Sequence, residues 1–167
     1  KLVTGENFDV VTGTDLTVPA NQRSLEEYVR KHKPLVAVGG PPCTAFGNWS
    51  RLNRVNAPET YAKSRRSGLA MANLFASIAG IQAEGGRYFL CENPAGSELF
   101  QLPAYTALQR DFPIGEITFP QCQVGLMSPE GLPILKRTTL WSNAEELLVP
   151  FHGLACSCRQ HGCLEGA

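Results

Sequence analysis

The sequence lacks a net charge, a long hydrophobic run and any internal repeat. Its 15 Lys and Arg residues balance its 15 Asp and Glu residues, so no overall field draws the chain to nucleic acid or to an acidic membrane, and any such partner has to be held by a local patch. No apolar stretch approaches the length of a membrane span, which predicts a protein without a membrane partner. With 167 residues, 43% of them hydrophobic and 18% charged, the composition is that of a folded domain with a real core.

The beginning of the chain and its cysteines indicate where the protein resides. The first residues, Lys1–Gly5, contain neither an initiator methionine nor the hydrophobic region of a signal peptide, so we expect a piece of a longer polypeptide that is not secreted. The six cysteines would suit three disulfides by number, but three of them crowd with a histidine into eight residues, which favours a metal site over a disulfide frame. The sequence therefore predicts an intracellular protein in a reducing compartment, the nucleus or the cytoplasm.

Two short apolar segments each end by presenting a reactive side chain. Leu35–Val38 is followed by paired glycines and prolines, which cannot continue a helix, and Cys43 comes directly after them. Arg87–Cys91 is a second short run, of aromatic and aliphatic residues, and it leads to Glu92 just before Pro94. Because ligand crevices of open α/β sheets lie at the carboxyl ends of the strands, the thiol and the acid are predicted to face one crevice.

Helical patterns separate these segments. From Ser24 to Lys33 apolar residues recur at helical spacing, with Ser24 and Glu27 as a capping box, and Thr60–Ile81 is a longer helix with a basic start and an apolar second half. Further expected strands are Phe8–Val11, Gly115–Phe119 and a hairpin of Leu132–Leu135 with Thr138–Trp141. This alternation predicts an α/β, Rossmann-like fold, truncated at the N-terminus, with a mainly parallel sheet and helices on both of its faces.

The chain divides into one domain and a tail. No linker splits residues 1–150, which we expect to form the α/β domain, and residues 151–167 form a Cys/His-rich tail. The tail contains the spacing Cys-x-Cys-x-x-His-x-Cys, and its four candidate ligands are Cys156, Cys158, His161 and Cys163. Thiolates and imidazole are the ligands that tetrahedral zinc selects, so a zinc knot is predicted, with His152 and Cys122 as further candidates. The alternative is an unliganded, flexible end.

Cys43 and Glu92 have complementary chemistry. A cysteine is nucleophilic as its thiolate, and backbone N–H groups or positive charge at the mouth of a crevice favour that form. Cys43 would attack an electron-poor carbon while Glu92 protonates or hydrogen-bonds the neighbouring nitrogen of the same ring. The alternative is that Cys43 is a small buried hydrophobic residue and Glu92 an ordinary surface acid.

The two motifs resemble those of DNA cytosine-5 methyltransferases. Val38–Phe46, which reads VGGPPCTAF, looks like the nucleophile motif of that family, and Glu92–Pro94 is similar to its Glu-Asn-Val motif in the form that phage and retroelement-borne relatives carry. The resemblance implies that Cys43 attacks C6 of a flipped-out cytosine, that Glu92 contacts N3, and that C5 takes a methyl group from S-adenosylmethionine. The implied partner is nucleic acid, DNA more than RNA.

The same resemblance implies further site residues. Gly13–Leu16 is similar to the segment whose acid and following backbone bind the adenine of the cofactor, which assigns Asp15 and Leu16 to cofactor binding, together with Pro41 of the nucleophile motif. Gln121–Gly125 and Lys136–Asn143 look like the later strands of the phage-type branch. They offer Lys136 or Arg137 as a partner for the base, and Arg137 is taken as the third catalytic residue.

Two departures from the family pattern leave the activity open. The glycine-rich Phe-x-Gly-x-Gly turn that holds the methionine end of the cofactor is expected ahead of residue 1, and Gly47 stands where the family has a serine. One function is an S-adenosylmethionine-dependent cytosine methyltransferase; the alternative is a catalytically inactive, methyltransferase-derived module that binds nucleic acid or protein. The loop Phe46–Arg54, with Trp49 and two arginines, suits phosphate and base contacts or a plain surface loop.

Overall fold

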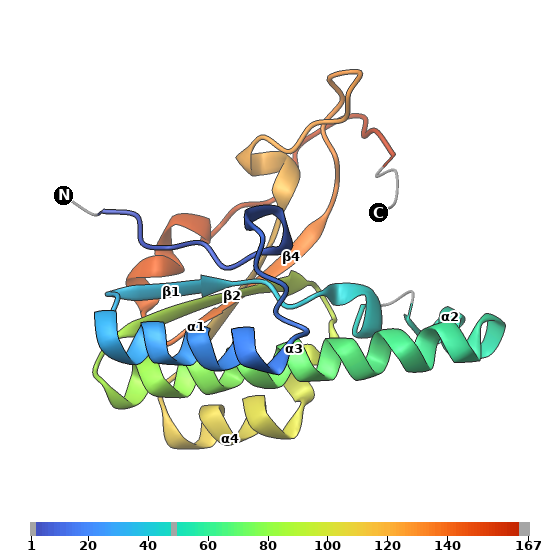
Figure 1. Ribbon diagram of the computed structural model, residues 1–167. Coiled ribbons are helices and arrows are strands. Elements are labelled where there is room, and N and C mark those ends of the chain that lie inside the picture. The colour runs from blue at the N-terminus through green and yellow to red at the C-terminus, as the bar shows by residue number, and fades with distance from the viewer. Residues whose placement is uncertain (1–2, 48–49, 164–167) are drawn as a thin grey trace.

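A four-stranded sheet forms the centre of the computed structural model, which describes residues 3–47 and 50–163 (Figure 1). The strands are β1 (Val36–Gly39), β2 (Tyr88–Pro94), β3 (Gly115–Pro120) and β4 (Arg137–Ser142). Their order across the sheet is β1-β2-β4-β3. The architecture is therefore mixed α/β, as the alternation of strand and helix patterns predicts.

The sheet is mixed, and the prediction of a mainly parallel sheet is wrong. Of the described strand pairs, β1 and β2 run parallel, whereas β4 runs antiparallel to both β2 and β3. The parallel pair is joined by α3 (Pro58–Glu84), because parallel strands require a long crossover. The expected hairpin of residues 132–135 with 138–141 does not form, since β4 inserts between β2 and β3 and gains pairing partners on both sides.

The other helices are α1 (Pro19–His32), α2 (Ser50–Asn56) and α4 (Pro103–Asp111). α1 begins at Pro19 and not at Ser24, because proline at the first position already has the helical φ angle. Ser24 lies inside the helix and its hydroxyl donates to the Ala20 carbonyl at 3.1 Å, so the predicted capping box is absent. The expected strand Phe8–Val11 is also wrong, because Val10–Thr12 is a 3₁₀ turn capped by Asp9.

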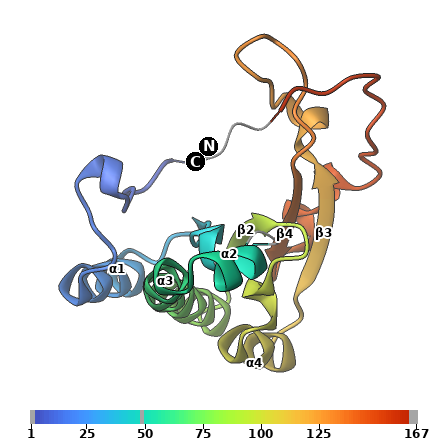
Figure 2. The ribbon, with the colours of Figure 1, turned by 90° about the vertical axis from the view of Figure 1, so that its right-hand side faces the viewer.

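The α-helices that pack on the sheet cover one of its faces. Alternate strand residues, among them Phe89, Cys91 and Trp141, point toward α3 and α4 and are fully buried there. Trp141 lies at the centre of this core, with its ring centroid 5.2 Å from those of both Phe89 and Tyr105. Figures 1 and 2 show α1, α3 and α4 on the same side of the sheet.

The opposite face is covered by short turns, so the prediction of helices on both faces is wrong. The 3₁₀ turns η5 (Glu145–Leu147) and η6 (Val149–Phe151) follow β4 and pack Leu148 and Phe151 over Phe119 and Leu140. A proline within this segment prevents a longer helix. In the part of the chain that the structure describes, no helix has both the length and the apolar run that crossing a membrane requires.

Candidate functional site

The strand that precedes Cys43 and the strand that carries Glu92 end at the same edge of the sheet. β1 and β2 are parallel neighbours, and their register pairs Gly39 with Cys91, the residue before Glu92. Cys43 begins the 3₁₀ turn η2 (Cys43–Ala45) beyond the end of β1, and its side chain is exposed. The thiol is therefore open to solvent, and the alternative of a buried hydrophobic residue does not hold.

Three hydrogen bonds fix the loop that presents Cys43. The Asn93 amide, 1% exposed, donates to the Pro41 carbonyl at 2.8 Å, so the residue after Glu92 holds the start of the loop. Beyond the thiol, the Arg65 guanidinium donates to the Ala45 carbonyl at 2.8 Å, and the Glu98 amide donates to the carbonyl of the next residue, Phe46, at 2.9 Å. The loop is thus anchored before Cys43 by Asn93 of β2, and after Cys43 by Arg65 of α3 and the backbone of Glu98.

Donors surround one oxygen of the Glu92 carboxylate. Oε1 accepts hydrogen bonds from the Thr138 hydroxyl at 3.1 Å, the Lys136 ammonium at 3.3 Å and the Gln121 amide at 3.5 Å. The Gln121 amide also donates to the Thr138 hydroxyl at 2.7 Å, so these two side chains form an oriented chain that ends on Glu92. The other oxygen, Oε2, receives no hydrogen bond from the described residues. One carboxylate oxygen is therefore held and the other is open.

The Cys43 loop passes directly beside that open oxygen. Gly40 has no side chain, and a Cβ placed on it would lie 3.6 Å from Oε2 of Glu92 and 3.6 Å from the Glu92 carbonyl oxygen. These are ordinary van der Waals distances, so the loop backbone lies next to the carboxylate without a clash. The structure therefore brings the predicted thiol loop and the predicted acid together at one edge.

The cation that reaches Glu92 is Lys136 and not Arg137. The ammonium of Lys136, the residue before β4, and the hydroxyl of Thr138 both contact Glu92, whereas Arg137, which lies between them in the chain, is exposed. The Lys136 and Glu92 side chains are 31% and 35% exposed, so this ion pair is partly screened by water and serves to orient the carboxylate. A catalytic role of Arg137 stays a prediction.

A cavity of about 890 Å³ lies beside β1, the size of a small-molecule site. Leu16 and Pro41, two of the predicted cofactor-binding residues, line it. Its wall also contains Gly40, so one end of the cavity adjoins Glu92. Further lining residues are Glu6, Phe8, Asp9 and Tyr28.

Asp15, the third predicted cofactor residue, forms a local turn. Its carboxylate accepts hydrogen bonds from the Thr17 hydroxyl at 2.7 Å and from the Thr17 backbone N–H at 2.8 Å. These bonds, the hydroxyl first, hold the pKa of Asp15 below its usual value. Asp15 is exposed and is not among the residues that line the cavity. The geometry matches the turn-forming interpretation of Asp15, and a cofactor role stays a prediction.

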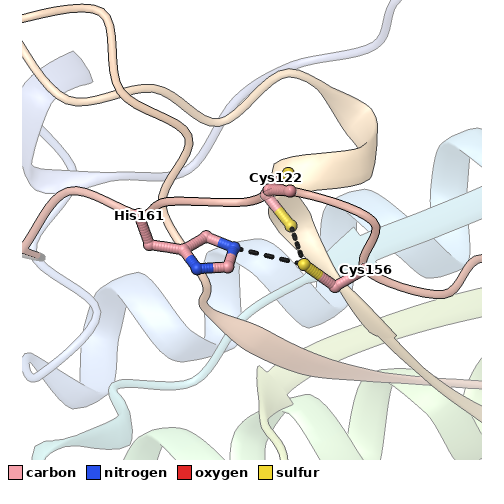
Figure 3. A group of neighbouring side chains, drawn as sticks. Cys122, Cys156 and His161 are labelled. Atoms are coloured by element: carbon pink, nitrogen blue, oxygen red, sulfur yellow. Dashed lines mark hydrogen bonds between the residues drawn. The ribbon is translucent and has the colours of Figure 1, made fainter.

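Near the C-terminus the structure gathers four groups that could hold a metal ion. Three are predicted ligands, Cys156, Cys158 and His161, and the fourth is Cys122 of η4 (Gln121–Val124); their ligand atoms lie within 4.8 Å of one another. Figure 3 shows Cys156 between Cys122 and His161, with its sulfur 3.7 Å from the Cys122 sulfur and 3.1 Å from Nε2 of the histidine. Cys163, the remaining predicted ligand, is exposed and does not belong to this group.

The pKa values of two thiols in this group shift in opposite directions. Burial raises the pKa of Cys122, but its hydrogen bonds with Gln123, Cys156 and Cys158 lower it, and the net direction is downward. The pKa of Cys158 is raised to about 11, first by burial and then by its hydrogen bonds with Cys122 and Cys156. Cysteine binds metal as its thiolate, and the pKa of Cys122 is shifted in the direction of that form.

The remaining sequence predictions are resolved only in part. The region predicted as a polar loop contains the helix α2 (Ser50–Asn56), and Trp49 lies outside the described residues. Cys91 faces the core, where burial raises the pKa of its thiol, so it is not a second nucleophile.

No family model matches this chain, and no curated protein matches its sequence. Its function therefore has to be inferred from the site itself.

Proposed function

We propose that this chain is a methyltransferase-like domain that acts on cytosine in nucleic acid, with Cys43 as the nucleophile. One observation carries the proposal: the Glu92 carboxylate, held at Oε1 and open at Oε2, lies against the loop that exposes the Cys43 thiol. Such a pair provides a nucleophile and an acid at one edge of a sheet, which is what attack on a pyrimidine ring requires.

The roles of the two residues follow from the chemistry of cytosine. The Cys43 thiolate forms a bond to C6, and the electron pair of the C5–C6 double bond moves into the ring. Glu92 donates a proton or a hydrogen bond to N3 through its open oxygen, which stabilises the negative charge that develops. C5 thereby becomes nucleophilic and would be alkylated. A water molecule then takes the proton from C5, the released electron pair re-forms the C5–C6 double bond, the proton at N3 returns to Glu92, and the Cys43 sulfur leaves C6 as a thiolate.

Three neighbours keep Glu92 in position for this step. Thr138 is fully buried, and its hydroxyl links Gln121 to the carboxylate. The Lys136 ammonium approaches the same oxygen from the start of β4. Because all of these donors converge on Oε1, they restrict rotation of the carboxylate and leave Oε2 available to N3 of the cytosine base.

The cavity beside β1 fits a cofactor of the size of S-adenosylmethionine, which supplies the methyl group when bound. Leu16, Phe8 and Tyr28 would offer an apolar and aromatic wall, and Glu6 and Asp9 would offer acceptors for hydroxyl or amino groups. Pro41 and Gly40 lie where this cavity meets the Cys43 loop. The proposal therefore assigns the methyl donor to this cavity and the base to the neighbouring strand ends.

The alternative is an inactive module that binds nucleic acid through the same sheet edge. One observation favours it: the Asp15 carboxylate is turned to Thr17 and does not line the cavity. In this alternative Lys136 and the exposed Arg137 would contact phosphate, and Cys43 would form no bond to the base.

A trapping experiment separates the two functions. Duplex DNA that contains 5-fluorocytosine is incubated with the protein and S-adenosylmethionine, and the expected product is a covalent complex at Cys43, because fluorine at C5 blocks the elimination that releases the enzyme. Cys43→Ser should form no complex, whereas Cys163→Ser, which changes another exposed thiol, should form it normally. DNA binding that is equal for wild type and Cys43→Ser, without any adduct, would establish the binding module and refute the enzyme. The same probe in RNA tests the preference for DNA.

The donor set of the Cys/His group suits zinc. Three thiolates and one imidazole form a closed tetrahedral set, typical of structural zinc, whereas a catalytic zinc keeps one position open. We therefore propose a structural zinc ion for this group and no metal step at Cys43.

A further inference from the structure

The segment that contributes Cys122 to the Cys/His group also contributes to the Glu92 site. Gln121, whose amide donates to Thr138 and reaches Glu92, is the first residue of η4, and Cys122 is the second. We propose that Cys122, Cys156, Cys158 and His161 bind one metal ion, that this ion fastens the tail to η4, and that it thereby holds Gln121 in position against Glu92. The role of the ion at Glu92 goes beyond the chemistry proposed for Cys43.

The spacing of the donor atoms fits coordination of one metal ion. Two thiolates at ~2.3 Å from a tetrahedral zinc lie about 3.8 Å apart, and the sulfurs of Cys122 and Cys156 are 3.7 Å apart. The Nε2 atom of His161, 3.1 Å from the Cys156 sulfur, completes a group compact enough to surround one ion.

Contacts outside the group hold the tail against residues 128–134, the segment that follows η4. The Gly162 N–H donates to the Pro133 carbonyl at 2.9 Å, and Gly162 forms a parallel bridge with Ile134. A Cβ on Gly162 would lie 3.0 Å from the Cβ of Ser128, so the close approach of the tail depends on glycine at this position. This bridge holds the residue after His161 and leaves Cys163 exposed beyond it.

A neighbouring glutamine supports the metal group from η4. The Gln123 amide lies 3.7 Å from the Cys122 sulfur and 3.5 Å from the Cys158 sulfur, where it donates to both. Hydrogen bonds of this kind orient thiolate ligands around a metal. η4 is therefore held from two directions, with Gln121 directed to the Glu92 site and Cys122 and Gln123 directed to the tail. Gln121 is a positioning residue, since it acts on the base only through Thr138 and Glu92.

Metal binding tests the ligand set. Zinc affinity is measured by competition with a chelator, and Co²⁺ substitution reports thiolate ligation by its absorption. Wild type and Cys163→Ser should bind one equivalent equally well, whereas Cys122→Ser should bind more than about 100-fold more weakly, because it removes a direct ligand. Gln123→Leu should cost about tenfold. Circular dichroism of each variant confirms that it folds. Full affinity in Cys122→Ser, or loss of binding in Cys163→Ser, would overturn the assignment.

NMR tests the link to Glu92 without any assay of methyl transfer. The side-chain amide resonances of Gln121, assigned with Gln121→Glu, should shift and exchange faster when zinc is removed or when Cys122 is changed to Ser. The amide of Gln82, which donates to the Pro34 carbonyl at 2.9 Å and the Tyr88 carbonyl at 2.8 Å away from the tail, is the control and should stay unchanged. Unchanged Gln121 resonances after zinc loss would overturn the link, whatever the outcome of the trapping experiment.

Discussion

The Asn93→Ala variant tests the anchoring of the nucleophile loop. Asn93 follows Glu92 in β2 and is 1% exposed. Its amide donates to the Pro41 carbonyl at 2.8 Å, and its carbonyl oxygen accepts from the Ser97 hydroxyl at 2.8 Å. Alanine removes both bonds and leaves two buried polar groups without these partners, because Pro41 and Ser97 are themselves buried.

The expected cost follows from these contacts. Each of the two lost hydrogen bonds contributes about 1 kcal/mol, and a buried carbonyl left without a donor adds about 1–3 kcal/mol, so the free energy of unfolding should fall by about 3–5 kcal/mol. For a chain of this size that loss corresponds to a decrease in Tm of roughly 6–20 °C. Ser97→Ala keeps the bond between Asn93 and Pro41. It removes two others, the bond that the Ser97 hydroxyl donates to Asn93 and the bond that it accepts from the Leu99 N–H, so it should cost about 2 kcal/mol.

Urea unfolding monitored by tryptophan fluorescence measures these differences, because Trp141 lies at the centre of the core. Asn53→Ala, which changes an exposed asparagine in α2, is the matched control and should stay within about 0.5 kcal/mol of wild type. If Asn93→Ala is no less stable than this control, the Pro41 carbonyl has another partner or the loop is not anchored as described.

Three further predictions concern β1, the core and the N-terminal turn. Gly39→Ala should lower the free energy of unfolding by about 1–3 kcal/mol, because the new Cβ would overlap the ring of Phe75. Cys91 should resist alkylation at pH 8 until the protein is unfolded, since burial raises the pKa of its thiol; peptide mass spectrometry would show early modification if this is wrong. Thr17→Val should raise the pKa of Asp15 toward its usual value, which NMR of the carboxyl carbon measures. An unchanged titration would contradict the hydrogen bonds assigned to it.

The first and third of these predictions carry controls of their own. Gly40→Ala should be tolerated in stability, because its new contacts to Glu92, at 3.6 Å, are of ordinary length. For Asp15, the lowered pKa means that its contribution to stability is present above the unfolded value near 3.9 and is lost as the pH falls through the folded value. Because Asp15 is exposed, the effect on stability is small, and the titration itself is the readout.

Local patterns in the sequence determined the part of the fold that positions Cys43 and Glu92. A short apolar run that ends in glycines and prolines, a long apolar helix and a second short run indicate a strand, a crossover and a parallel strand, and the structure has β1, α3 and β2 in that arrangement. Because such a crossover aligns the carboxyl ends of its two strands, both residues were predicted at one edge.

Tertiary structure alone decided which distant residues join that edge. β4 lies between β2 and β3. The alternation of side chains along a strand shows which of its faces is buried, but it does not specify which strands it pairs with. Whether Lys136 or Arg137 reaches Glu92 depends on how the chain enters β4, and a shift of the register by one residue would exchange their positions. Cys122 joins a group whose nearest member in sequence is 34 residues away, so the local spacing of the tail could not rank it above Cys163. Sequence patterns report neighbours along the chain, whereas a metal group and a hydrogen-bonded carboxylate are assembled by neighbours in space.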